Sequence, residues 1–422
     1  MNQLRPLIPL LIAAAILLAG NGVQGTAIAV RGAAEGFSTG LIGLMGTAYF
    51  AGFLLGSIYV VRILNAVGFI RTFAALAAIA ASGTLLLMVI VDPLAWIIIR
   101  FVVGFCFVGL FSTVEGWINS SVPNAVRGRV LSIYRIIDIS AVTGAQFMLP
   151  ALGAEGFVLF AVMSIMITLS LVPVSLADRS SPKPPEAVGF DLRKIWVLSP
   201  LACIGCVAIG ATNAAFRLIG PLYAEGIGLG ISDVATFMSA GIVGGAVLQF
   251  PLGYLSDRYD RRTILLFVTM CAFAAGMFLT LFAGSSPALN YIGIFTFGAF
   301  ALPLFSLSAA HANDHAGKGD HALVAAGLMF FFAIGAMIGP FASSLVIEFF
   351  GVNALFTYTS LVHLALAIAT VWRMRRRAGV PVDERSPFAV LLRTSPTFAK
   401  LTKAQEAQNG STDDDSSAKR SN

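Results

Sequence analysis

The chain has 422 residues, of which 57% are hydrophobic and 11% are charged, and its formal net charge is +6. Soluble domains carry roughly a quarter charged residues, so this composition excludes an ordinary soluble enzyme or binding domain. It indicates a protein that crosses a membrane many times. The positive charge then serves orientation, and we expect no nucleic-acid partner, since no basic surface with interleaved aromatic residues lies outside the apolar segments.

Apolar segments long enough to cross about 30 Å of hydrocarbon recur along the chain. They are continuous rather than alternating, which favours helices over the strands of a membrane barrel. The expected spans are 7–30, 39–61, 72–91, 94–118, 130–152, 157–176, 199–220, 234–255, 263–282, 288–310, 322–347 and 352–372. The sequence therefore predicts an all-α membrane protein with twelve transmembrane helices.

Lysines and arginines indicate the orientation of these spans, because they are retained on the cytoplasmic side. Placing both termini in the cytoplasm puts nearly all of the loop arginines inside and leaves only Arg31 in an outside loop. We expect a multi-pass protein of the cell (cytoplasmic) membrane. All four cysteines fall in expected spans, and Cys203 and Cys206 lack a second pair that could complete a zinc site. We expect neither a metal nor a cofactor.

The two halves of the chain repeat each other. A shift of about 192 positions brings Asn21 onto Asn213 and Gly68 onto Asp260. Internal repeats around a site at the membrane midplane are a common plan of transporters. We therefore expect two pseudo-symmetric six-helix bundles, at residues 1–177 and 199–377, joined by a cytoplasmic linker at 178–198. We expect residues 378–422 to form a cytoplasmic, largely disordered tail without transport chemistry.

A charged loop and two glycine patterns carry a resemblance to a known family. The segment GYLSDRYDRR at 253–262 resembles the signature loop of the major facilitator superfamily, with Asp260 at the usual second glycine, and RILNAVGFIR at 62–71 is a weaker first-half copy. The segments RFVVGFCFVG at 100–109 and GAMIGP at 335–340 resemble patterns of the fourth and eleventh helices. The segments RGRVLSIY, FRLIGPLYA, SDRYDRR and AHAND further resemble the YcaD-like bacterial branch.

The resemblance implies a cytoplasmic gate at the signature loop. A carboxylate at Asp257 can meet the positive end of an adjacent helix while the arginines pair across the bundle interface, which would hold the cytoplasmic side closed. The alternative is that the arginines only anchor the chain on the cytoplasmic side. The expected gate residues are Gly253, Asp257, Arg258, Asp260, Arg261 and Arg262, with Arg62, Asn65, Gly68 and Arg71 from the first-half copy.

Polar residues inside the spans indicate a cavity, because an ionisable group in hydrocarbon is costly unless it faces water or a partner. In the superfamily, helices 1, 4, 7 and 10 line the central cavity, so the resemblance places Asn21, Gln24, Arg100, Asn213 and Arg217 there. Two guanidiniums favour an anionic or zwitterionic substrate. The alternative is that either arginine pairs with a helix end or with backbone carbonyls.

A second set of buried polar residues suggests coupling. Arg135 and Asp138 are three positions apart and can share a helix face, so they form either a proton-responsive pair or a self-neutralising structural one. Glu115 is the other candidate for a proton-responsive group. His311 and Asn313, in AHANDH, favour hydrogen bonding or a gate role over a metal site.

The sequence thus predicts a non-enzymatic secondary active transporter that moves a small solute by alternating access, with protons as a candidate coupling ion. Its expected partners are that solute and the lipid bilayer, and we expect a monomer. A drug-efflux carrier remains an alternative, as does a transporter-like membrane sensor without flux. The antiporter-type Gly-Pro signature of the family is absent around Gly144, which disfavours efflux.

Overall fold

The computed structural model describes residues 7–122, 124–154, 156–176, 191–317, 320–376, 380–381 and 388. Within these residues the regular structure is entirely α-helical, which confirms the predicted fold class. Most of the expected tail and the linker residues before Asp191 lie outside the described residues. Several expected spans consist of two consecutive helices separated by a single-residue break.

The helices of the first half correspond to the first six expected spans. They are α1 (Ile8–Gly22), α2 (Gln24–Ala34), α3 (Thr39–Val67), α4 (Phe69–Val89), α5 (Pro93–Ser121), α6 (Asn124–Gln146), α7 (Met148–Leu152), α8 (Phe157–Leu169) and α9 (Leu171–Leu176).

The second half starts with a short helix in the expected linker. Its helices are α10 (Leu192–Leu198), α11 (Pro200–Gly226), α12 (Ile231–Val247), α13 (Gln249–Arg258), α14 (Arg261–Leu281), α15 (Pro287–Ala301), α16 (Leu304–Asn313), α17 (His321–Phe350) and α18 (Ala354–Arg376).

Eleven helical segments of the described chain are long and apolar enough to cross a membrane. The remaining expected span, at 130–152, consists of α6 and α7. It carries Arg135 and Asp138 near its centre, which lowers its apolar character. It nevertheless packs inside the molecule, against α1 and α12.

The ends of the helices follow from local chemistry. Ser38, Asp92 and Ser286 each accept a hydrogen bond from the backbone N–H three residues on, and so cap α3, α5 and α15. Gly68 and Gly351 end α3 and α17 with φ of 83° and 85°, a conformation that favours glycine. These signals leave only short connections between neighbouring spans.

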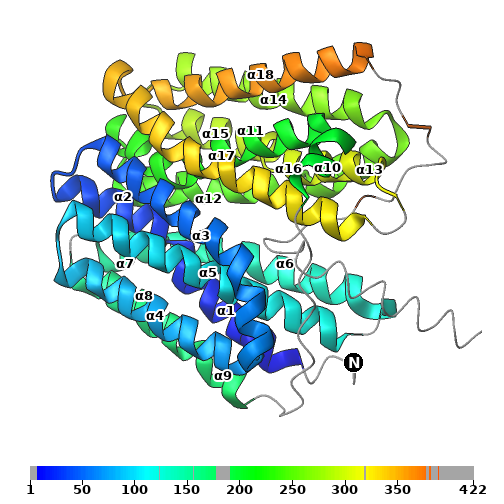
Figure 1. Cartoon of the computed structure of the whole chain (residues 1–422). Helices are drawn as coiled ribbons and strands as arrows, with labels where there is room; N and C mark the ends of the chain where they lie inside the picture. The colour runs from blue at the N-terminus through cyan, green and yellow to red at the C-terminus, as the bar shows by residue number, and fades with distance from the viewer. Residues whose placement is uncertain are drawn as a thin grey trace, which may run out of the picture.

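The helices form two bundles that lie side by side, α1 to α9 in one and α10 to α18 in the other (Figure 1). We call the end that carries Leu176, Asp191 and Arg376 the linker end, and the other the opposite end. The glycine contacts between the halves, described below, lie toward the opposite end.

Glycines set the closest helix contacts within each half. A Cβ on Gly52 of α3 would lie 1.8 Å from the carbonyl oxygen of Phe101, and one on Gly104 of α5 would lie 2.0 Å from that of Tyr49. In the second half, Cβ atoms on Gly244 and Gly298 would lie 2.1 and 2.0 Å from carbonyl oxygens of α15 and α12. Because Gly52 and Gly244 are separated by the repeat shift, the same packing device occurs in both halves.

Glycines also join the halves toward the opposite end. A Cβ on Gly43 of α3 would lie 2.7 Å from the carbonyl oxygen of Pro340 in α17, and Thr47 donates a hydrogen bond of 2.5 Å to the carbonyl oxygen of Met337. A Cβ on Gly25 of α2 would lie 3.2 Å from the carbonyl oxygen of Arg217 in α11.

The glycine-proline segment of α17 packs closely on α11, as its spacing predicts. Cβ atoms on Gly335 and Gly339 would lie 1.9 Å and 2.1 Å from the carbonyl oxygens of Val207 and Ala211. Small residues at four-residue spacing let two backbones approach in this way. The contact fixes the position of α11, which lines the site described below.

We expect Gly52→Ala to destabilise the fold by about 1–3 kcal/mol, because the added methyl group must push α3 away from α5. The measurement is the thermal unfolding of the purified protein in detergent. Gly144→Ala is the matched control, since a Cβ there meets nothing within 4 Å. Equal melting temperatures for the two variants would show that the α3–α5 contact has room for a side chain.

Candidate functional site

A cavity of about 230 Å³ lies between the two halves. Helices α1, α2, α3, α5 and α6 line it from the first half, and helices α11, α12, α13, α16 and α17 line it from the second. Its polar lining side chains are Asn21, Gln24, Thr26, Tyr49, Arg100, Arg135, Gln146, Asn213, Arg217, Gln249 and Ser306. The six of these that the sequence placed in a cavity or coupling role thus share one cavity, although their role in binding stays a prediction.

The charge of the lining has one sign. Arg100, Arg135 and Arg217 all line the cavity, and no aspartate or glutamate of the described residues does so. A cavity between two helical bundles has a lower effective dielectric constant than bulk water, so the guanidinium charges are less screened there. The cavity is therefore suited to a negatively charged group.

Arg100 is the most deeply buried of the three, with 4% of its surface exposed. Its Nη1 donates to Oε1 of Gln24 at 2.7 Å, and its guanidinium lies 4.2 Å from the ring centre of Tyr49. Gln24 is oriented in turn, since its Nε2 donates to Oγ1 of Thr84 at 3.1 Å. Nε of Arg100 has no partner, and no carboxylate of the described residues lies within ion-pair distance of it.

Arg217 lines the cavity from the second half. Its Nε donates to Oδ1 of Asn213 at 3.1 Å, one turn away on α11. The close approach of Gly25 to the backbone of Arg217 brings α2 and α11 together at this level. Arginines from both halves therefore face the same space, and a solute between them can contact both.

A third arginine connects the halves through a polar chain. Nη1 of Arg135 lies 2.7 Å from Oδ2 of Asp138, and Nη2 donates to Oε1 of Gln249 at 3.5 Å. Nε2 of Gln249 donates to Oγ of Ser306 at 3.3 Å. The chain runs from α6 to α13 and α16. Asp138 is buried and outside the lining, so it acts on the cavity through Arg135.

Several lining residues were missed by the sequence reasoning. Gln146 accepts from Oγ1 of Thr26 at 2.8 Å and donates to the carbonyl oxygen of Gly22 at 2.8 Å, which ties α6 to α1 and α2. Tyr49, Gln249 and Ser306 were also not selected. The signal was available for the two glutamines and the serine, because they are polar residues in apolar spans. Tyr49 carries no such signal.

The rest of the lining is apolar and partly aromatic. It comprises Phe50, Phe53, Phe111, Leu218, Met238, Ile242, Leu302, Phe305, Met329 and Phe332. Ligand pockets for drug-sized molecules have volumes of roughly 300–1,000 Å³, so this cavity fits a smaller solute. Phenylalanine and methionine surfaces suit an apolar body, while the arginines suit a charged head group.

Four predicted residues lie outside this lining. Glu115 is fully buried, and the hydroxyl of Tyr134 donates to its Oε1 at 3.5 Å. His311 lines a separate small pocket with Arg262 and Arg373, and Asn313 is the last residue of α16. Asp138 is buried and contacts the cavity through Arg135. No group of three or more His, Cys, Asp or Glu in the described part of the chain could hold a metal ion.

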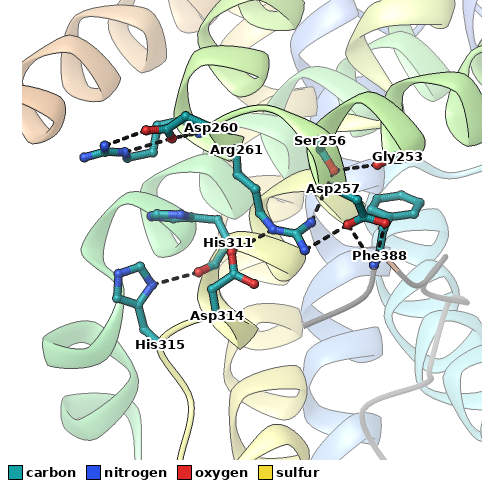
Figure 2. A network of polar contacts seen from close by, with 10 residues as sticks. Gly253, Ser256, Asp257, Asp260, Arg261, His311, Asp314, His315 and Phe388 are labelled. Carbon is teal, nitrogen blue, oxygen red and sulfur yellow. Dashed lines mark hydrogen bonds and ion pairs between the residues drawn. The ribbon is translucent and has the colours of Figure 1, made fainter. Parts of the chain in front are cut away.

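The signature loop forms a polar network at the linker end (Figure 2). Arg261 pairs with Asp257 at 3.0 Å and with Asp314 of α16 at 2.7 Å. Asp260 accepts from the backbone N–H of Arg262 at 2.9 Å and thereby caps α14. Asp260 and not Asp257 thus caps α14, and the predicted contact of Asp257 with the end of an adjacent helix stays a prediction. These contacts stay within the second half, and pairing across the interface stays a prediction.

Except for the buried Gly253, the remaining gate candidates lie on the surface of the linker end. The guanidinium of Arg258 lies 4.4 Å from the ring centre of Tyr254. In the first-half copy, Arg62 lies 5.2 Å from the ring centre of Tyr59, while Asn65 and Arg71 are exposed. Gly68 ends α3. Gly253 lies on α13, one turn from Asp257, in the loop network of Figure 2.

Two helical bundles with a polar cavity between them define a membrane transporter. The sequence profile of the Major Facilitator Superfamily matches residues 10–298 and 201–403, and the chain belongs to that family. An uncharacterized MFS-type transporter of Enterobacter sp. (strain 638) is 24% identical over 382 residues, which cover 89% of this chain and 96% of the relative. The uncharacterized MFS-type transporter YcaD of Escherichia fergusonii is 22% identical over 83% of this chain and 91% of its own length.

Solved structures share the fold. The nucleoside transporter NupG has a TM-score of 0.75 and 12% identity, covering 89% of this chain and 100% of its own. A bacterial homologue of the human lysosomal transporter Spinster, in an inward-facing and unoccupied conformation, has a TM-score of 0.73 and 13% identity, covering 92% and 99%. The predicted family and its YcaD-like branch are thus confirmed.

Proposed function

We propose that this protein is a non-enzymatic secondary active transporter that moves a small organic anion across the cytoplasmic membrane by alternating access. The observation that carries the proposal is Arg100, a guanidinium buried in the cavity wall with a neutral amide and an aromatic ring as its partners. Burying one charge without an opposite charge is costly. A substrate carboxylate or phosphate supplies that opposite charge.

The lining also separates the alternatives. A cationic drug would be repelled by the guanidiniums of Arg100 and Arg217, and a large drug would exceed the cavity, so efflux of cationic drugs is the weaker candidate. The apolar lining favours an anion with a hydrocarbon or aromatic body. A sensor would bind the same anion but would not move it, so flux distinguishes the two functions.

The orientation of the protein follows from its charges. The linker end carries Arg193, Lys194 and the arginines of the signature loop, and the positive-inside rule assigns this end to the cytoplasm. With this assignment, the contacts between α3 and α17 close the outer side. With the outer side closed, we expect the cavity to be reached from the cytoplasm.

Reporter fusions test this orientation. Fusions after Ser181 and after Arg376 are expected to read as cytoplasmic, whereas a fusion after Glu225, near the end of α11, is expected to read as outside. The measurement is the paired activity of reporters that function on only one side of the membrane. A cytoplasmic reading at Glu225 would contradict the orientation and the number of spans.

The substrate class is tested by ligand-induced thermal stabilisation and by flux in proteoliposomes. The panel contains aliphatic and aromatic carboxylates, organic phosphates, amino acids, sugars and cationic drugs. We expect carboxylates or phosphates to stabilise the protein and to be transported. Arg100→Gln should weaken their binding about 30-fold or more, the usual cost of removing one partner from a buried charged pair.

Gln24→Glu is the complementary variant in this experiment. It keeps the shape of the side chain and gives Arg100 a permanent carboxylate at the position of the amide oxygen. We expect the variant to be as stable as the wild type or more stable, and to bind the anion weakly. Wild-type anion affinity in both Arg100→Gln and Gln24→Glu would show that Arg100 does not contact the substrate.

Proton coupling is supported by the contact between Arg135 and Asp138. While Asp138 is ionised, it neutralises Arg135 beside the cavity at 2.7 Å. A proton on Asp138 removes that neutralisation, so the cavity gains one positive charge and binds an anion more strongly. Proton binding and anion binding then favour each other, as symport requires. Glu115 remains the second candidate for a proton-responsive group.

We expect Asp138→Asn to abolish accumulation driven by a pH gradient while preserving substrate exchange, because the amide cannot exchange a proton. The measurement is uptake and counterflow in proteoliposomes with and without an imposed gradient. Asp233→Asn is the control, since Asp233 accepts from the hydroxyl of Tyr291 at 2.7 Å and does not line the cavity. Wild-type accumulation by Asp138→Asn would make the Arg135–Asp138 pair structural.

A further inference from the structure

We infer that the surface formed by Gly253 and Asp257 on α13 is a docking site for Phe388 of this chain's own C-terminal segment, and that docking holds the linker end open. The backbone N–H of Phe388 donates to both carboxylate oxygens of Asp257, at 3.0 Å to Oδ1 and 3.2 Å to Oδ2 (Figure 2). Phe388 follows the last helix, which ends at Arg376.

The ring of Phe388 occupies the space that a side chain at position 253 would fill. A Cβ on Gly253 would lie 2.3 Å and 2.4 Å from Cδ1 and Cε1 of the ring. The ring therefore lies directly on the backbone of α13. It also packs against the apolar cluster that contains Leu252 and Leu265. The surface thus recognises an aromatic side chain and the amide of the same residue.

Arg261 holds the carboxylate of Asp257 in position for its contact with Phe388. Its Oδ1 pairs with Nη2 of Arg261 at 3.0 Å, and Nε of Arg261 pairs with Asp314 at 2.7 Å. Arg261 is 97% buried, so its charge is little screened by solvent. The network joins α13, α14 and α16, and docking of Phe388 adds the C-terminal segment to it.

The docking site and part of the cavity lining lie on the same helix, α13. Gln249 lines the cavity one turn before Gly253 on α13, and Ser306 lines it from α16. A segment bound at Gly253 and Asp257 therefore contacts the same helix that carries Gln249. Movement of α13 toward the first half must displace or carry Phe388, so the two events are mechanically linked.

The consequence for transport rests on the proposed function. The resemblance implies that Asp257 meets the positive end of an adjacent helix when the linker end closes. In the present structure the same carboxylate accepts the amide of Phe388. One carboxylate cannot serve both partners with the same oxygens, and the ring covers the glycine that would permit close approach. Phe388 therefore competes with closure and slows the transport cycle.

The distance between the halves at the linker end tests this competition without any substrate. Spin labels at Val67→Cys on α3 and Val197→Cys on α10 use two exposed positions, in a full-length chain whose four native cysteines are replaced by alanine. Pulsed electron spin resonance reports the populations of short and long distances. Phe388→Ala, which removes the ring, should raise the ratio of short to long distances about three- to tenfold, the effect of losing one ordinary contact.

Two further variants make the test specific. Phe388→Pro removes the amide hydrogen and should cause a similar shift, which separates the hydrogen bond from the ring. Phe398→Ala changes another phenylalanine of the tail and should leave the distances unchanged. Distances unaltered in both Phe388 variants, or shifted equally by Phe398→Ala, would overturn the docking proposal.

The outcomes also separate this proposal from the proposed function. If the distances shift in the Phe388 variants but no anion is transported, the docking proposal stands and the proposed transport of an organic anion is wrong. If anions are transported by every variant at the wild-type rate and the distances do not shift, the docking proposal fails alone. We expect Phe388→Ala to shift the distances and to raise the initial rate of anion flux.

Discussion

The arrangement of the cavity depends on one buried positive charge. Arg100 is buried, with 4% of its surface exposed, and its neighbours reduce the cost of burying its charge without removing that charge. The face of Tyr49 attracts a cation through its quadrupole, and the amide of Gln24 accepts a hydrogen bond. Neither partner is an anion. The positive potential therefore remains in the cavity and makes its chemistry selective.

The contacts of Arg100 require several helices to be held in fixed positions relative to one another. Tyr49 and Arg100 belong to α3 and α5, which approach closely because of Gly52 and Gly104. Gln24 begins α2, directly after the break that follows α1, and Thr84 of α4 fixes its amide. The packing glycines and the electrostatic site are thus parts of one structure, and a change that separates α3 from α5 would also move the tyrosine away from the arginine.

The spans and the polar cavity could be predicted because they depend on local properties of the sequence. An apolar run of sufficient length indicates a span, and a charged residue inside one indicates a cavity or a partner. These rules brought Arg100, Arg217 and Asn213 to the same cavity. They do not give the partner of each group. Tyr49 escaped notice because tyrosine is common in spans and its contact with Arg100 depends on the approach of α3 to α5.

The signature loop also shows that a local sequence pattern does not give the partner of each charged group. Its charges were recognised from the sequence, but two aspartates three positions apart are both plausible helix caps. The backbone decides between them: Asp260 directly precedes α14, whereas Asp257 lies on the last turn of α13. The contact of Asp257 with Phe388 joins residues 131 positions apart. A local pattern contains no information about such a contact.

The glycine contact between α3 and α17 has a consequence for how the two halves separate at the opposite end. Where two backbones meet without large side chains between them, few interdigitated side chains must change rotamer before the helices separate. The peptide groups along such a contact are already bonded within their own helices, so entering water does not orphan them. The two helix surfaces can therefore separate with few side-chain rearrangements, and water can enter between them as they part.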